Sequence, residues 1–403
     1  MSARRAVPVT ALAAACFVVS AEARVVAPLL PTIAASLGVS VTAAGSAVTL
    51  YLLPYGLCQI GYGPLADRIG KFRVIRACML VLAAGTLACA LAPSLVVLDV
   101  LRLLTGMAAA AIFPMSMAHL GDTLPYGERP RAIGILMSGA AVGQTLSIAI
   151  GGAIGQFLDW RLVFLLYGAI ALGIGLWLAQ FAPAAAASSS ATSGEPWWRP
   201  YARLLASPTG RTLYLMVAVE GFFAMGAFTY VTALLQWRDG LSQLAASLVV
   251  TANGVGAFTA ARLLGHASHR LGERGSLVLG GLGAGVPYLL LAAPIGVWPA
   301  APLLLVMGAG WVLMHNVLQV RATEASPEAR GSSLAFFALS LFLGGSLGTT
   351  AHGLLIAAPG SYATVMAVGG LGLCTFGLLA PARLGVARRR PRPAPAAAGP
   401  SAG

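Results

Sequence analysis

Charged residues are scarce in this chain. Only 9% of its 403 residues are Asp, Glu, Lys or Arg, whereas soluble domains carry roughly 25%. A soluble fold with so few charges could not cover its surface with polar groups, so the composition excludes a soluble protein. With 58% hydrophobic residues and a mean hydropathy of +0.84, the chain is expected to have lipid as its solvent.

Cysteines are also few, and their positions exclude a disulfide framework. The five cysteines are odd in number, and all of them lie inside apolar runs. They show neither the paired spacing of disulfide-rich domains nor that of a metal site. We interpret the following residues as small buried apolar side chains: Cys16, Cys58, Cys78, Cys89 and Cys374.

Signatures of enzymes and of ATP-driven pumps are absent from the sequence. It contains no Gly-rich phosphate loop followed by Lys and Ser or Thr, so ATP is not expected to drive the protein. The apolar runs contain no Ser/His/Asp, paired-Asp or His-rich zinc pattern. We therefore expect the chain not to be an enzyme, and we expect no metal and no cofactor.

The chain has instead a series of continuous apolar runs, each about 20 residues long. A helix of this length crosses the ~30 Å hydrocarbon layer of a membrane. The runs lack the ten-residue alternation of transmembrane β-barrel strands. The sequence therefore predicts an all-α integral membrane protein with twelve transmembrane helices. They are expected at residues 7–30, 43–63, 74–92, 95–118, 132–155, 162–182, 212–236, 243–264, 276–296, 300–320, 332–355 and 361–381.

The formal net charge of +13 comes from arginines between the apolar runs. With the N-terminus inside, all but four of the 25 lysines and arginines fall in cytoplasmic segments or at their edges. This asymmetry is the one that the positive-inside rule describes. We therefore expect a multi-pass protein of the cell membrane with both termini in the cytoplasm, and no binding of nucleic acid.

An internal repeat divides the chain. Residues 38–73 align without a gap to residues 240–275. Two repeated six-helix units, related by an axis along the membrane normal, are typical of transporters that hold a substrate between their halves. The most informative identities fall in the loop after the second run of each half: Gly63/Gly265, Arg68/Arg270 and Gly70/Gly272.

The repeat predicts two six-helix bundles, at residues 1–182 and 212–382. Between them, residues 183–211 are rich in Ala, Ser and Pro and contain no apolar run of 20 residues, which predicts a cytoplasmic linker. Residues 383–403 are rich in Arg, Pro and Ala, and we expect a disordered cytoplasmic tail.

Three segments resemble motifs of the major facilitator superfamily. Gly63 to Arg73 resembles the loop between spans two and three, although Phe72 stands where the family has a basic residue. Leu98 to Gly106 resembles the fourth-span motif, built around an intramembrane Arg, and Asp159 to Arg161 resembles the outer end of span five. The resemblance covers essentially the whole chain. It implies two pseudo-symmetric six-helix bundles that move a small solute by alternating access, and we expect a monomer in the lipid bilayer.

Within the superfamily, the chain is most similar to the twelve-span drug/proton antiporter branch. The fifth-span motif of that branch contains glycines and a Gly-Pro pair. Its glycines are matched by Gly143 and by Gly151–Gly152, but the Gly-Pro pair is missing. We favour export driven by protons. A proton- or gradient-driven importer or uniporter of a small metabolite stays open as the alternative, and a receptor or scaffold that has lost transport is a third.

Charged residues inside the apolar runs are candidates for proton coupling, because a charge at mid-bilayer costs at least ~2.5–3.5 kcal/mol. At 1.5 Å per residue, Glu22 and Arg102 lie at matching depths and are expected to form a buried pair facing the central cavity. Glu22 would take up and release protons; a static pair that holds two helices together is the alternative. Glu220, without an evident basic partner in its half, and Asp99 complete the set.

Other polar residues in the apolar runs are expected to line the cavity between the halves. They are few, which favours an amphipathic or drug-like solute over a strongly polar one. Any one of them could instead form a hydrogen bond between helices. The candidates are Arg24, Gln144, Asn253, His315 and Asn316.

The loop after the second run is expected to act as a gate. By resemblance to the family, Asp67 contacts cytoplasmic arginines or a helix N-terminus of the other half and stabilises the state open to the outside. Loss of that contact would ease opening to the cytoplasm. A solvated charged loop is the alternative reading. The gating candidates are Gly63, Asp67, Arg68, Gly70, Lys71, Arg73 and Arg270.

Overall fold

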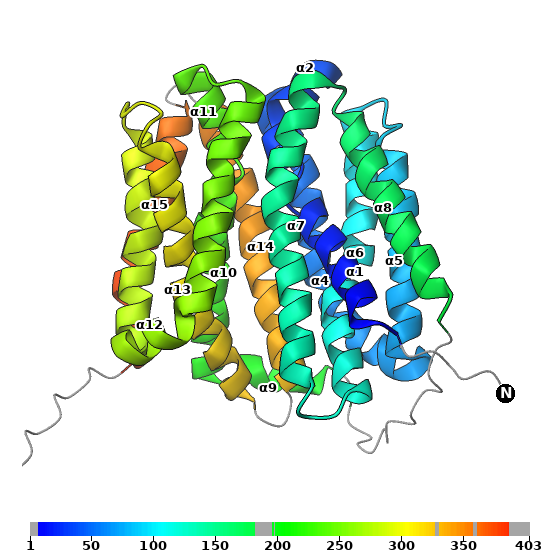
Figure 1. The fold of residues 1–403 in the computed structure, drawn as a ribbon. Helices are drawn as coiled ribbons and strands as arrows, with labels where there is room; N and C mark the ends of the chain where they lie inside the picture. Colours follow the sequence, from blue (N-terminus) through cyan, green and yellow to red (C-terminus); the bar gives the residue numbers. More distant parts are fainter. Residues whose placement is uncertain (1–6, 182–195, 197, 327–329, 358–360, 387–403) are drawn as a thin grey trace, which may run out of the picture.

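The structure is a computed structural model that describes residues 7–181, 196, 198–326, 330–357 and 361–386; of residues 264–269 and 361 it describes the backbone only. This part of the chain consists of helices and their connections, without a β-strand. Twelve helical segments are long and apolar enough to cross a membrane. The predicted all-α fold with twelve membrane spans is therefore confirmed (Figure 1).

The first half contains spans one to six. Its first two spans are interrupted, whereas each of the other four is one continuous helix. The elements are α1 (Val9–Glu22), η1 (Ala27–Leu29), α2 (Leu30–Leu37), α3 (Val41–Ala44), α4 (Ser46–Ile69), α5 (Lys71–Cys89), α6 (Leu95–Thr123), α7 (Arg129–Phe157) and α8 (Arg161–Ala179).

The second half contains spans seven to twelve. Its helix α12 includes two spans, Gln243–Leu263 and Arg270–Ala292, and its backbone turns at Gly272, where φ is 65°. The elements are α10 (Pro208–Phe228), α11 (Val231–Asp239), α12 (Gln243–Ala292), α13 (Ala300–Ala325), α14 (Arg330–Ala357) and α15 (Ser361–Arg383).

Part of the expected linker is helical. A short helix, α9 (Arg199–Ala206), lies within residues 183–211, and α10 begins at Pro208, before residue 212. Ser207 explains this start, because its side chain accepts a hydrogen bond from the backbone N–H of Gly210 and a proline follows it at the first helical position. Linker residues 183–195 and 197, and tail residues 387–403, lie outside the described residues, so their expected character stays a prediction.

The two halves repeat local geometry at the aligned positions. Ser40 and Ser242 each cap a helix by accepting a hydrogen bond from the backbone N–H three residues later, at 3.0 and 3.2 Å. Glycines at the repeated positions adopt positive φ, which other residues rarely do. These pairs are Gly38/Gly240 (φ 65° and 63°) and Gly70/Gly272 (φ 95° and 65°).

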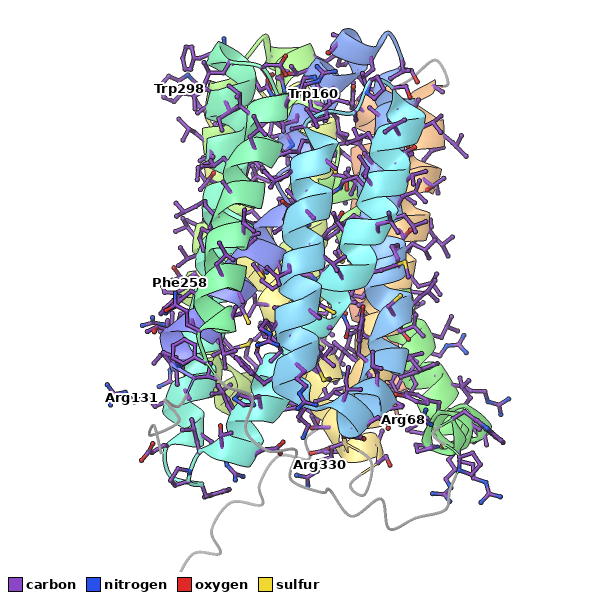
Figure 2. All side chains as sticks on the ribbon, turned by 90° about the vertical axis from the view of Figure 1, so that its right-hand side faces the viewer. Arg68, Arg131, Trp160, Phe258, Trp298 and Arg330 are labelled. Atoms are coloured by element: carbon purple, nitrogen blue, oxygen red, sulfur yellow. The ribbon has the colours of Figure 1, made fainter. Side chains whose placement is uncertain are left out.

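Both ends of the described chain lie on the same side, because the chain crosses twelve times. We call this side, which is lower in Figure 1, the terminal side, and the opposite side the far side. Arg68, Arg131 and Arg330 lie at the terminal side, and Trp160 and Trp298 lie at the far side (Figure 2). The helices α1 to α8 stand to the right in Figure 1, and α10 to α15 stand to the left.

The halves meet along two seams, α4 against α14 and α7 against α12. Near the far side, polar side chains join the halves. Gln243 at the start of α12 accepts a hydrogen bond from Thr32 Oγ1 at 2.6 Å and donates to the carbonyl of Pro28 at 3.0 Å. At the other seam, the hydroxyl oxygens of Thr49 and Thr350 lie 3.2 Å apart. These contacts close the far side.

Glycines allow the helices to approach closely along the α7–α12 seam. A Cβ added to Gly152 would lie 2.3 Å from the side chain of Ser247, and one added to Gly254 would lie 2.3 Å from Thr145 Oγ1. Small residues at such positions let membrane helices pack backbone against backbone. A larger side chain at Gly152 therefore cannot fit while the far side is closed.

Gly152→Val is expected to open the far side. The added side chain overlaps with Ser247 when the far side is closed, and such overpacking destabilises that state by roughly 1–3 kcal/mol. The measurement is oxidative cross-linking of cysteines placed at Thr49 and Thr350, across the other seam, after replacement of the five native cysteines. We expect the cross-linked fraction to fall.

Gly61→Val is the matched control, because a Cβ at Gly61 meets nothing within 4 Å. Cross-linking should be unchanged in this variant. Equal cross-linking in the Gly152 and Gly61 variants would show that the α7–α12 contact does not determine closure.

Candidate functional site

A cavity of about 1570 Å³ lies between the two halves. Its wall includes residues at the terminal ends of several helices, such as the exposed Asp67 and Arg131, so it opens toward the terminal side. Pockets for drug-sized ligands typically have roughly 300–1,000 Å³. The cavity therefore accommodates such a ligand together with water.

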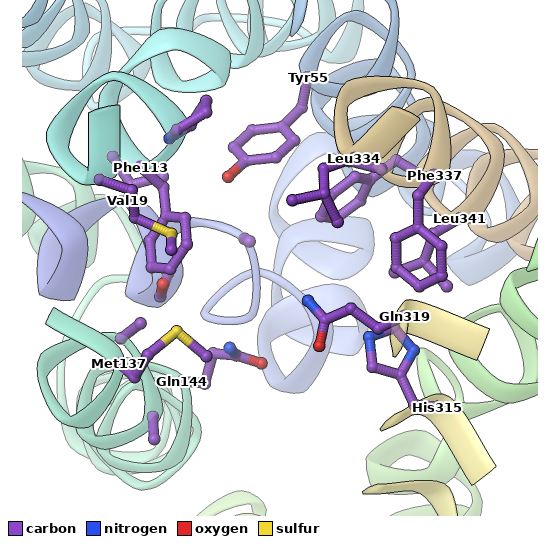
Figure 3. A pocket seen from close by; sticks show the side chains of 18 of the residues that line it. Val19, Tyr55, Phe113, Met137, Gln144, His315, Gln319, Leu334, Phe337 and Leu341 are labelled. Carbon is purple, nitrogen blue, oxygen red and sulfur yellow. The ribbon is translucent and has the colours of Figure 1, made fainter. Parts of the chain in front are cut away.

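Most of the cavity wall is apolar and adaptable. Figure 3 shows Phe113 and Met137 of the first half opposite Leu334 and Phe337 of the second half. Methionine side chains adjust to ligands of different shape, and aromatic rings offer large contact areas. Further aromatic and methionine residues of the wall are Tyr55, Met117, Met225, Phe228, Tyr288, Met307 and Trp311.

The structure places all five expected cavity residues on this wall: Arg24, Gln144, Asn253, His315 and Asn316. Gln144 on α7 and His315 on α13 face the space from opposite halves (Figure 3). Asn253 also donates a hydrogen bond to the carbonyl of Leu304 at 3.4 Å, so part of its amide joins α12 to α13. Gln319, one turn from His315, lines the cavity too, and sequence analysis missed it.

Glu220 has a partner that the sequence did not reveal. Its Oε1 lies 2.8 Å from Nδ1 of His315. The Glu220 side chain is 0% exposed, whereas 17% of the His315 side chain is exposed and lines the cavity. Trp311 stacks on the histidine ring at 4.7 Å, and Phe337 packs against it edge-on. The expectation that Glu220 lacks a basic partner is wrong, because spacing along the chain does not show that α10 packs against α13.

Glu22 and Arg102 do meet, and they are completely buried. Arg102 Nη1 donates to Glu22 Oε2 at 2.7 Å, and Nη2 donates to the backbone carbonyl of Glu22 at 2.9 Å. Its Nε donates to the carbonyl of Ala47 at 3.2 Å, and its guanidinium lies over the ring of Tyr51. The pair therefore joins α1, α4 and α6.

This pair does not face the cavity, contrary to expectation. Neither side chain is more than 1% exposed, and neither lines the cavity wall. Glu22 is the last residue of α1, and Arg24 lies in the turn that follows, where the span is interrupted. Arg24 lines the cavity, whereas Glu22 binds Arg102 inside the first half, so the two side chains point in different directions. Matching depths placed Glu22 and Arg102 at one height but left the direction of each side chain open.

Asp99 is also held within the first half. Its Oδ2 accepts a hydrogen bond from Ser46 Oγ at 2.6 Å, and it does not line the cavity. The hydrogen bond joins α6 to the start of α4. None of the four residues expected to couple protons therefore lines the cavity itself, although Glu220 reaches it through His315.

The expected gating loop lies at the mouth of the cavity. Gly63 and Asp67 line the wall there, and among the described residues Asp67 forms no ion pair and no hydrogen bond. The expected contact of Asp67 with the other half is thus not made while the terminal side is open. Lys71 pairs with Asp122 of its own half. The remaining arginines of the set are exposed: Arg68, Arg73 and Arg270.

Glu22→Gln is expected to destabilise the protein, because it leaves Arg102 buried without a counter-charge. Breaking a buried ion pair costs roughly 3–5 kcal/mol. We expect a clear fall in the melting temperature of the detergent-purified protein. Glu273→Gln is the control, since Glu273 is exposed and pairs with the half-buried Arg321, and exposed pairs contribute ~0–1 kcal/mol. Equal melting temperatures of the two variants would contradict a stabilising role for the buried pair.

Two repeated six-helix halves around a cavity that is closed on one side and open on the other form a secondary transporter. Residues 12–349 match the family model of the Major Facilitator Superfamily. The chain belongs to this superfamily, as the sequence motifs predicted, and is a multi-pass membrane transporter, not an enzyme.

Related proteins share about a quarter of their residues with this chain. YceJ of Bacillus subtilis, an MFS-type transporter, is 27% identical over 84% of this chain and 86% of its own length. A chloramphenicol resistance protein of Pseudomonas aeruginosa is 26% identical over 81% of this chain and 79% of its own length. Multidrug resistance protein D of Escherichia coli is 27% identical over 55% of this chain and 56% of its own length.

Two solved structures share the fold. A bacterial homologue of the human lysosomal transporter Spinster, in an inward-facing and unoccupied conformation, has a TM-score of 0.72 at 19% identity and covers 94% of both chains. The nucleoside transporter NupG has a TM-score of 0.76 at 13% identity, over 93% of this chain and 99% of its own. At these identities the likeness shows the fold alone.

Proposed function

We propose that the protein exports a small amphipathic solute across the cell membrane in exchange for protons, by alternating access. The observation that carries this proposal is the pair of Glu220 and His315 at the wall of the central cavity. The pair combines a fully buried carboxylate with a partly exposed imidazole, and side chains of these two types are the ones that most often take up and release protons in proteins. It supplies a proton-binding site beside the space that a solute would occupy.

The charge of this pair explains how protons could drive the transport cycle. When Glu220 is ionised and His315 is neutral, the pair is negative; one added proton makes it neutral overall. A buried charge without compensation is unfavourable within the membrane. The uptake and release of a proton therefore changes the relative stability of the states open to either side. Since Glu220 is fully buried, His315 is the route by which protons from the cavity reach it.

The apolar wall supports an amphipathic solute, and the relatives support export. Two of them are named for resistance to drugs or to chloramphenicol, a trait that fits removal of a compound from the cell. Glu22 and Arg102 take no direct part in this scheme, because the pair is closed off from the cavity. They hold three helices of the first half together.

Reconstituted proteoliposomes with an imposed pH gradient test the proposal. With an acidic interior, protons leaving the vesicle should drive accumulation of chloramphenicol or of another solute from an amphipathic panel. Glu220→Gln should abolish this accumulation but keep solute exchange down its own gradient, because the amide cannot ionise. His315→Asn should do the same, and Glu273→Gln is the surface control.

Three results would contradict the proposal in different ways. Solute flux without proton movement in the unmodified protein would favour the uniporter. Proton-driven accumulation that persists in Glu220→Gln would place coupling at another group. No flux with any member of the panel would argue against transport of amphipathic solutes.

We further propose that the terminal side faces the cytoplasm, since most arginines lie there. Alkaline phosphatase fused after Gly403 should then be inactive, because this enzyme needs the oxidising space outside the membrane. The same enzyme fused after Trp298, in the far-side connection between α12 and α13, should be active. The reverse pattern of activities would invert the proposed orientation.

A further inference from the structure

The first span of each half is interrupted partway along its length. In the first half α1 ends at Glu22 and η1 begins at Ala27, and in the second half α10 ends at Phe228 and α11 begins at Val231. Interrupted helices at corresponding positions of two repeats mark ligand sites in transporters, because backbone off the regular helix and its side chains face a cavity. Both interruptions lie beside the closed end of the central cavity.

Arg24 lies in the first interruption and lines the cavity. Its guanidinium is over the ring of Phe228, at the second interruption, with 5.4 Å between the guanidinium carbon and the ring centroid. The two interrupted spans therefore meet through this contact. Across the described residues, the guanidinium has no hydrogen bond and no ion pair.

Three other charged groups buried in the described spans have partners. Arg102 binds Glu22, Glu220 binds His315, and Arg238 on α11 binds Asp239 at 2.7 Å. Charged groups inside a membrane normally face a partner or a water-filled cavity, because lipid does not solvate them. Arg24 has no such partner and faces the cavity. The guanidinium carries five N–H donors, which recognise carboxylates and phosphates well.

The rest of the cavity suits an anion with an apolar body. Among the described residues of the wall, the ionic side chains include three arginines, Arg24 at the closed end and Arg131 and Arg262 nearer the mouth, and one carboxylate, that of Asp67. Such an excess of positive charge attracts anions into the cavity. The neighbours of Arg24, Phe228 and Tyr288, offer aromatic surface to the remainder of a ligand.

We propose that the transported solute is an amphipathic anion, whose carboxylate or comparable acidic group binds Arg24 at the closed end of the cavity. The apolar body of the solute packs against Phe228 and the aromatic wall. This inference rests on the proposed transport function and adds to it the chemical class of the substrate. It also assigns Arg24 as the residue that selects that class.

Binding measured without transport tests the substrate class. The protein in lipid nanodiscs is dialysed to equilibrium against radiolabelled naphthaleneacetate or its neutral amide, with empty nanodiscs to correct for partition into lipid. The two ligands differ only in the charged group. Near neutral pH the acid is ionised. A charge-assisted hydrogen bond contributes enough that the acid should bind roughly tenfold more tightly than the amide.

Variants of Arg24 identify the group that causes the preference. Arg24→Gln should remove the preference, so that the acid binds no better than the amide, while the affinity for the amide changes little. Folding should be retained, because no described residue depends on the Arg24 guanidinium for a hydrogen bond or an ion pair. Arg24→Lys keeps the charge and should retain part of the preference. Arg131→Gln removes the same charge from the mouth of the cavity and should change the preference for the acid over the amide by less than twofold.

Equal affinity for acid and amide in the unmodified protein would overturn the proposal, as would a preference that survives in Arg24→Gln. Absence of binding of both ligands would also overturn it. The proposed function is tested separately in proteoliposomes. Proton-driven transport of a neutral solute, together with equal binding of acid and amide, would leave export in place and reject the anionic substrate alone.

Discussion

The unfavourable energy of a charge in hydrocarbon accounts for the arrangement of the ionic groups in this protein. Arg102 can be buried because Glu22, two backbone carbonyls and the ring of Tyr51 compensate its charge. Glu220 can be buried because His315 binds its carboxylate. Arg24 lacks such a partner and lies where the cavity admits water. The buried clamp, the proposed proton site and the proposed solute site thus differ in how the charge of each is compensated.

Alternating access requires that the seam between the halves can open without large loss of energy. The far-side contacts are suited to this, since hydroxyl and amide groups join the halves, as in the bonds of Gln243 with Thr32 and Pro28. Hydrogen bonds between such groups contribute only about 0.5–1.5 kcal/mol each, because water replaces the partner on opening. Glycines such as Gly152 add close packing that is lost when the halves separate. The closed far side is therefore stable but reversible.

The functional residues were only partly predictable. Arg24, Gln144 and His315 were identified as cavity residues because polar groups in apolar runs need water or a partner, and they do line the cavity. The contact of Glu22 with Arg102 followed from equal depth. The bond between Glu220 and His315 was not predicted, although both residues were named, since neither spacing nor depth shows which helices of a bundle are neighbours.

By itself, the sequence determined the number of the spans and the internal repeat, because a hydrophobic run and a repeated motif can be identified without knowing how the helices pack. The tertiary structure decided which face of each helix meets the cavity. Glu22 and Arg24 are only two residues apart, and the interruption of the first span together with the packing of the neighbouring helices establishes which of them points to the cavity. That choice buries Glu22 as part of a clamp and places Arg24 on the cavity wall.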